Sequence, residues 1–133
     1  MTDLAGDLVL LAGKLIRQLR RDINMPASYR VLATLEDLGS AGISQLASAH
    51  GISQPTMSAQ VAGLVEQGYV AKTPHPTDAR AQVLSLTDAG RTYLRENRER
   101  LAETIRGRLA THSEAEVATA VAVLTSLTEK GNA

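Results

Sequence analysis

The chain has 133 residues, 44% of them hydrophobic and 21% charged, with a formal net charge of zero. It contains no cysteine, which excludes disulfides, thiolate zinc sites and thiol-based redox sensing, and its apolar runs are far shorter than the roughly 20 residues of a membrane span. The N-terminus lacks the pattern of an export signal, so we expect a single cytoplasmic domain with an aliphatic core, because only three Tyr and no Phe or Trp occur.

Two helices are predicted before residue 40. Apolar residues recur at three- and four-residue steps through the first 23 residues, which is the spacing of an amphipathic helix. A second helix follows Pro26 and ends at Gly39, since proline favours a helix start and glycine a helix end. Residues 40–42 are then expected to form a loop. The first stripe consists of Leu4, Leu8, Leu11, Leu15, Leu19 and Ile23.

The stretch from Ile43 onward carries the clearest pattern. Ile43–Gly51 and Ser53–Gly68 predict two short helices separated by a tight turn. Residues 69–74 and 81–86 predict two strands, joined by a polar tip at residues 75–80. Helix, turn, helix and hairpin is the layout of a winged helix-turn-helix, which places its second helix in the DNA major groove. The predicted fold class is therefore mainly α with a small β-hairpin wing (α+β).

Two further helices are predicted after the hairpin. Thr87 or Asp88 can cap a long helix whose Arg- and Glu-rich face, through Arg108, is expected to be solvated. Ser113 and Glu116 have the spacing of a capping box that opens a last, apolar helix.

The first and last helices carry more apolar surface than a small winged core can cover. We therefore expect them to form a dimerisation lobe, because symmetric homodimers are the commonest assemblies. In the alternative, both stripes pack within one subunit. Residues 1–133 are thus predicted to be one domain, with residues 1–24 and 88–131 for dimerisation and residues 26–87 as the DNA-binding lobe.

The helix that begins at Ser53 has a small, polar and uncharged outward side once its apolar residues face the core. Ser53 is expected to cap this helix, and the amides of its first turn are expected to attract DNA phosphate. Glutamine amides can read adenine, and serine and threonine hydroxyls can serve several base edges. The candidate DNA-contacting residues here are Ser53, Gln54, Pro55, Thr56, Ser58, Ala59 and Gln60.

The hairpin adds charged candidates. Arg80 is expected to enter the neighbouring minor groove, and Asp78 to orient that arginine or the tip by hydrogen bonding. His75 lies at the same tip. Arg30 and Lys72, with Arg80 and Arg91, are expected to supply most phosphate contacts. No basic residue occurs between residues 54 and 67, so we expect a shallow salt dependence.

At these positions the sequence resembles the MarR family (multiple antibiotic resistance regulators). The wing motif D-x-R at Asp78–Arg80, followed by L-T-x-x-G at Leu86–Gly90, carries most of the resemblance. It is supported by Leu46-Ala47, Ser53–Ser58, Leu64 and Gly68-Tyr69-Val70. The sequence departs from the family at Ala59, Gly63 and Ala79, where members often carry Arg or Lys.

The resemblance implies a homodimeric transcription regulator, a repressor, that binds a pseudo-palindromic operator. Many such proteins release DNA when a small aromatic or phenolic molecule binds. Contacts for an aromatic acid would come from Arg17, Arg20 and Tyr29, although Tyr29 has a second interpretation as a residue that closes the core.

Other functional classes find little support in the sequence. The histidines His50, His75 and His112 lack metal-ligand spacing, and no motif of a nucleotide-binding or hydrolytic enzyme occurs. We expect no enzyme, no metal and no cofactor. A winged-helix module that binds proteins instead of DNA stays open as an alternative, because the chain and its second short helix are electrically neutral.

Overall fold

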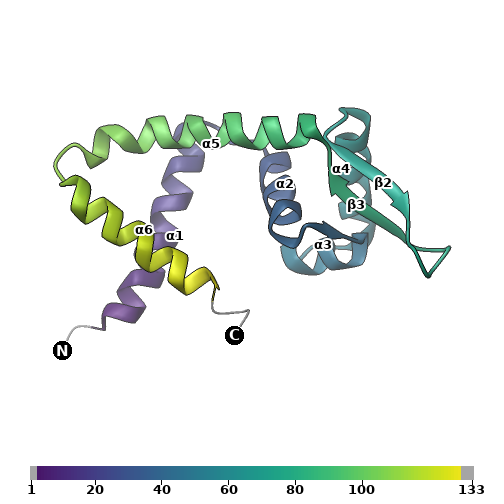
Figure 1. Ribbon diagram of the computed structural model, residues 1–133, viewed down its shortest axis with the longest axis horizontal. Helices are drawn as coiled ribbons and strands as arrows, with labels where there is room; N and C mark the ends of the chain where they lie inside the picture. The colour runs from purple at the N-terminus through teal and green to yellow at the C-terminus, as the bar shows by residue number, and fades with distance from the viewer. Residues whose placement is uncertain (1–2, 130–133) are drawn as a thin grey trace. The chain divides into compact units, whose positions relative to one another are not determined.

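The computed structural model describes residues 3–129 (Figure 1). Its residues cluster into two units, Ile23–Arg100 and, among the described residues, 3–22 with 101–129. Helix α5 (Asp88–Leu109) contributes to both units. Residues 1–2 and 130–131 of the predicted dimerisation segments lie outside the described residues. Within residues 3–129, no helix is long and apolar enough to cross a membrane.

The Ile23–Arg100 unit contains three short helices that begin and end where the sequence predicts. Helix α2 (Ala27–Leu38) follows Pro26, and helix α3 (Ile43–His50) ends at Gly51. Gly51 adopts φ 64°, a left-handed conformation that side chains with a Cβ rarely take, and this allows the tight turn into α4 (Gln54–Glu66). The turn fixes how α4 is presented relative to α3.

The sheet of this unit has three strands, one more than the sequence predicts. Strands β2 (Val70–Pro74) and β3 (Gln82–Leu86) form the expected hairpin. The expected loop at residues 40–42 is wrong in part, because β1 (Ser40–Ala41) pairs antiparallel with β3 and gives the order β1-β3-β2. A strand of two residues has no alternation to recognise, and its partner lies more than 40 residues away in the chain.

The core of this unit is aliphatic, as the composition predicts, with one methionine. Tyr29 is also buried, with 8% of its surface exposed. The rings of Tyr69 and Tyr93 lie 4.6 Å apart, and the Tyr93 hydroxyl is 3.0 Å from Ser28 Oγ. The largest fully buried side chains are those of Leu32, Leu35, Leu46, Met57, Val61, Leu84 and Leu94.

The charged face of α5 is exposed, as the sequence predicts, and two of its arginines also bond to neighbouring segments. Arg98 Nη2 donates to Glu36 Oε1 of α2 at 2.7 Å, and this hydrogen bond raises the pKa of Arg98. Arg100 Nη2 donates to the carbonyl oxygen of Ile23 at 3.0 Å. These bonds therefore link residue 23 and the last turn of α2 to α5.

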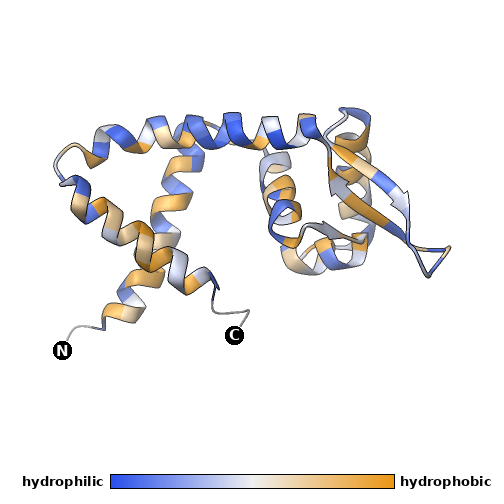
Figure 2. Ribbon diagram, in the orientation of Figure 1, coloured by the Kyte–Doolittle hydropathy of each residue, from blue (hydrophilic) through white to orange (hydrophobic). Residues whose placement is uncertain are grey.

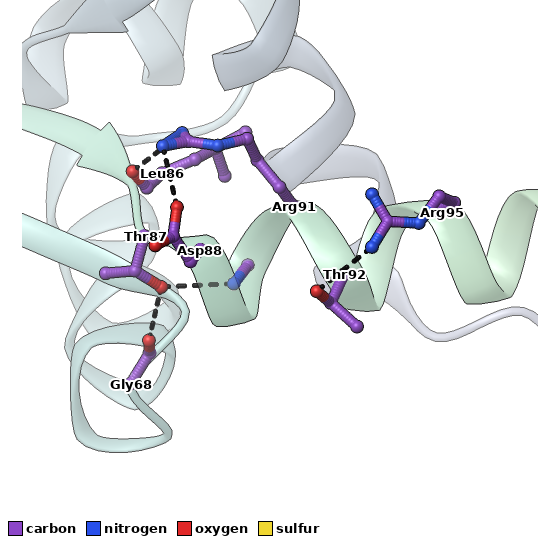
Figure 3. A network of polar contacts seen from close by, with 8 residues as sticks. Gly68, Leu86, Thr87, Asp88, Arg91, Thr92 and Arg95 are labelled. Atoms are coloured by element: carbon purple, nitrogen blue, oxygen red, sulfur yellow. Dashed lines mark hydrogen bonds and ion pairs between the residues drawn. The ribbon is translucent and has the colours of Figure 1, made fainter.

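A polar network joins the hairpin to α5 and explains the L-T-x-x-G motif (Figure 3). Thr87 Oγ1 donates to the carbonyl oxygen of Gly68 at 2.5 Å and accepts from the amide of Gly90 at 3.0 Å. A Cβ on Gly90 would lie 2.2 Å from the carbonyl oxygen of Tyr69, so only glycine fits there. Arg91 Nη1 donates to the carbonyl oxygen of Leu86 at 3.2 Å. One hydroxyl thus caps α5 and ties it to the base of the wing.

The second unit contains α1 (Leu4–Asp22), the end of α5 and α6 (Glu114–Glu129). Arg108 of α5 donates to Asp22 Oδ2 at 2.8 Å and to Gln18 Oε1 at 3.2 Å, which fastens α5 to α1. The predicted capping box is confirmed, because the Ser113 amide donates to Glu116 Oε1 at 2.9 Å and the Glu116 amide to Ser113 Oγ at 3.1 Å. These bonds from Ser113 lower the pKa of Glu116.

This unit leaves large apolar side chains exposed. Both α1 and α6 are largely coloured as hydrophobic in Figure 2, yet none of the residues of α6 is buried. An apolar groove of about 410 Å³ is lined by α1 and α6 together. Its lining residues are Leu8, Leu11, Ala12, Leu15, Ala120, Val123 and Leu124.

Candidate nucleic-acid interface

Helix α4 is held by one face and presents the other to solvent. Met57, Val61 and Leu64 are buried in the core, as the sequence predicts, and Val65 is half-buried. Every other candidate on this helix is exposed, so the outward side is polar, small and uncharged. The exposed residues are Gln54, Pro55, Thr56, Ser58, Ala59, Gln60, Ala62 and Gly63.

The N-terminus of α4 offers fewer amides than the sequence suggested. Ser53 is the N-cap, and its Oγ accepts from the Thr56 amide at 3.2 Å while it donates to Thr56 Oγ1 at 2.8 Å. Pro55 has no N–H, and the Met57 amide donates to the Ser53 carbonyl oxygen. Among residues 53–57, the amides of Ser53 and Gln54 make no bond to the described residues and are left for a phosphate. Phosphate binding at this end of α4 stays a prediction, with fewer free donors than an uncapped first turn offers.

The wing tip brings three predicted residues together. Asp78 Oδ1 accepts from the backbone amide of Arg80 at 3.0 Å and lies 3.7 Å from Arg80 Nε. This is the kind of contact within the tip that the sequence suggests for Asp78. His75 Nδ1 lies 3.1 Å from the amide nitrogens of Thr77 and Asp78. The Arg80 side chain itself is 95% exposed and extends into solvent.

A hollow of about 420 Å³ connects the wing to the start of α4. Arg80 and Gln54 both line it, so the arginine of the wing and the first residue of α4 share one concave surface. Ser44 and Gln82 also line it and were not predicted from the sequence. Both are exposed polar residues beside apolar positions, and nothing in the local pattern distinguishes them from ordinary surface residues.

The remaining predicted residues lie elsewhere. Arg30 on α2 and Lys72 on β2 are exposed, but neither lines the hollow. Arg17 and Arg20 lie on α1, whereas Tyr29 lies in the core of the other unit.

The charge of this surface is balanced. Between residues 43 and 86, Lys72 and Arg80 are matched by Glu66 and Asp78.

The histidines do not form a cluster. His50 Nε2 is 3.0 Å from Thr34 Oγ1, and within residues 3–129 no three His, Asp or Glu side chains form a metal-binding group.

The chain is similar to known regulators over most of its length. A model of the MarR family matches residues 25–81. The HTH-type transcriptional regulator Mb0904 of Mycobacterium bovis is 33% identical over 117 residues, which are 85% of this chain and 82% of that protein. The crystal structure of RV1404 from Mycobacterium tuberculosis is 27% identical, with a TM-score of 0.69, over 98% of this chain and 93% of that chain.

A mutant of MarR from E. coli, complexed with operator DNA, shares the fold. It is 19% identical, with a TM-score of 0.59, over 95% of this chain and 99% of that chain. The match covers 95% of this chain and so includes residues of both units. The chain therefore belongs to the MarR family of HTH-type transcriptional regulators.

Proposed function

We propose that the protein is a sequence-specific DNA-binding repressor that acts as a homodimer on a pseudo-palindromic operator. Helix α4 lies in the major groove, and Arg80 enters the adjacent minor groove. The observation that carries this proposal is the shared hollow, in which the arginine of the wing and the start of α4 face the same space. The protein acts in the cytoplasm by binding, without catalysis.

The uncharged surface of α4 suits direct reading of bases more than electrostatic anchoring. Gln54 and Gln60 offer amides for adenine, and Ser58 offers a hydroxyl. The small residues Ala59 and Gly63 let the helix backbone approach the base edges closely, since no long side chain holds it away.

The dimer is supported by the exposed apolar surface of α1 and α6. Side chains of this size are seldom left as a continuous exposed surface on a monomer. A second copy that contributes the same two helices would cover the groove and place two copies of α4 on one duplex.

We further propose that a small aromatic acid releases the DNA. Arg17 is exposed and Arg20 half-buried on α1, and both are cations that can bind a carboxylate. Tyr29 is almost fully buried, so closure of the core accounts better for its position than ligand contact does. Isothermal titration with benzoate tests this role, since Arg17→Ala should weaken any binding.

The DNA-binding proposal is tested by Arg80→Ala. Arg95→Ala is the control, because it removes the same positive charge. Arg95 lies on α5 and has a local contact with Thr92 Oγ1 at 3.3 Å. Because an arginine contact to DNA contributes about 1–3 kcal/mol and a dimer has two arms, we expect affinity to fall on the order of 100-fold for Arg80→Ala. Fluorescence anisotropy with a mixed-sequence duplex at low salt measures this.

The same assay separates a regulator from a protein-interaction module. A module without DNA function would show no duplex binding by the unsubstituted protein and no effect of Arg80→Ala. The salt dependence adds a second test. Arg30, Lys72 and Arg80 give about six phosphate contacts in a dimer, which predicts a log–log slope of about −5, and a slope near −9 or steeper would contradict the proposal.

A further inference from the structure

The side chain of His75 makes hydrogen bonds to the backbone of the wing tip. Its Nδ1 lies 3.1 Å from the amide nitrogen of Thr77 and 3.1 Å from that of Asp78, and 3.3 Å from Thr77 Oγ1. A backbone N–H can only donate, so Nδ1 must accept and cannot carry a proton. The ring is therefore neutral in this conformation, with its proton on Nε2.

The hydrogen bonds of His75 connect to Arg80 through Asp78. The His75 ring holds the amide of Asp78, and the Asp78 carboxylate holds the amide of Arg80 at 3.0 Å. Two backbone bonds close the same tip, from the His75 amide to the Ala81 carbonyl oxygen at 3.1 Å and from the Ala81 amide to the Asp78 carbonyl oxygen at 3.0 Å. The backbone direction from which the Arg80 side chain leaves is thus set by two successive side-chain bonds.

Because the tip is exposed, its order depends on these hydrogen bonds. Residues 75–80 are all exposed, so burial contributes little to their order. An arginine on a mobile tip loses more conformational entropy on binding than one whose backbone is already fixed. Polar capping bonds are therefore the main source of order for the part of the wing that carries Arg80.

We propose that His75 is the positioning residue of the wing, and that its neutral ring orders the tip so that Arg80 is preorganised for the minor groove. This inference rests on the proposed DNA-binding function. It goes beyond that function by assigning His75 an indirect role, through the backbone and Arg80, in place of a contact of its own with DNA.

Two substitutions separate the indirect role from a direct contact. His75→Asn keeps an acceptor at the position of Nδ1, since asparagine caps turns with Oδ1 in the same way. His75→Gln loses that acceptor but carries an amide donor near the position of Nε2. We expect His75→Asn to bind duplex DNA like the unsubstituted protein, and His75→Gln to bind about three- to tenfold more weakly.

The Arg80→Ala background gives the decisive comparison. If His75 acts through Arg80, His75→Gln should have no further effect once Arg80 is removed, because the two changes affect one interaction. An undiminished effect in that background would overturn the proposal. So would full binding by His75→Gln, or binding by His75→Asn as weak as that of His75→Gln.

A measurement without DNA tests the cap separately. Nitrogen-15 NMR of the intact protein at a pH of about 8 should show the His75 proton on Nε2. A proton on Nδ1 would overturn the inference even if DNA binding is confirmed. If the ring has the expected form but the unsubstituted protein binds no duplex, the proposed function fails, and the role of His75 toward DNA fails with it.

Discussion

Leu11 of α1 lines the apolar groove, and 58% of its surface is exposed in the single subunit. Replacing Leu11 with Ala removes roughly three methylene equivalents, or about 2.4 kcal/mol of burial free energy for a fully covered side chain. Because about half of the side chain is left to be covered by a partner, the loss is about 1.2 kcal/mol in each subunit. A twofold dimer contains the change twice, which gives about 2.5 kcal/mol, or a dissociation constant raised between roughly 30- and 100-fold.

Sedimentation equilibrium over a range of protein concentrations measures this shift. Leu38→Ala is the matched control, because Leu38 is 42% exposed but lies on α2 in the other unit. We expect Leu38→Ala to leave the dimer unchanged. If Leu11→Ala and Leu38→Ala had the same dissociation constant, or if the unsubstituted protein were monomeric at micromolar concentration, the dimer proposed for α1 and α6 would be refuted.

Three further predictions test the fold. Thr87→Val removes the hydroxyl that caps α5 and should lower the free energy of unfolding by about 1–3 kcal/mol in urea denaturation, whereas Thr87→Ser should lower it far less. Gly90→Ala should lower the free energy of unfolding by about 3 kcal/mol, because its Cβ would lie 2.2 Å from a backbone carbonyl oxygen. Gly63→Ala, with open space around it, should raise the free energy of unfolding by about 0.5–1 kcal/mol. Equal effects of the two substitutions would contradict this reasoning. Bonds from Ser113 lower the pKa of Glu116 from its usual 4.5. The stability that these bonds contribute is therefore present above pH 4.5 and is lost as the pH falls through the lowered pKa. Glu116→Gln should lack that acid-dependent loss in unfolding measured from neutral to acidic pH, and an unchanged pH profile would count against it.

The helices could be predicted because their ends carry local capping chemistry. Ser53 begins α4, Gly51 ends α3, and the Ser113–Glu116 pair opens α6, each within a few residues of its bonding partner. The two strands of the wing were predicted from their apolar residues and from the turn between them. Such signals depend on neighbours in the sequence, which is why they can be read without a structure.

The features that were missed depend on partners far away in the chain. Strand β1 pairs with residues more than 40 positions later, and the bond from Arg98 to Glu36 spans 62 positions. The hollow of the candidate site combines the starts of two helices with one strand, so Ser44 could not be recognised from its own surroundings. The ring nitrogen of His75 is local, but a histidine cap has no common sequence signature.

Selection of bound sequences from a pool of random duplex DNA tests the central claim most directly. A twofold dimer that presents two copies of α4 should recover an inverted repeat whose half-sites are about one helical turn apart, roughly 10–10.5 base pairs. Recovery of no preferred sequence, or of a single half-site without a repeat, would contradict the account.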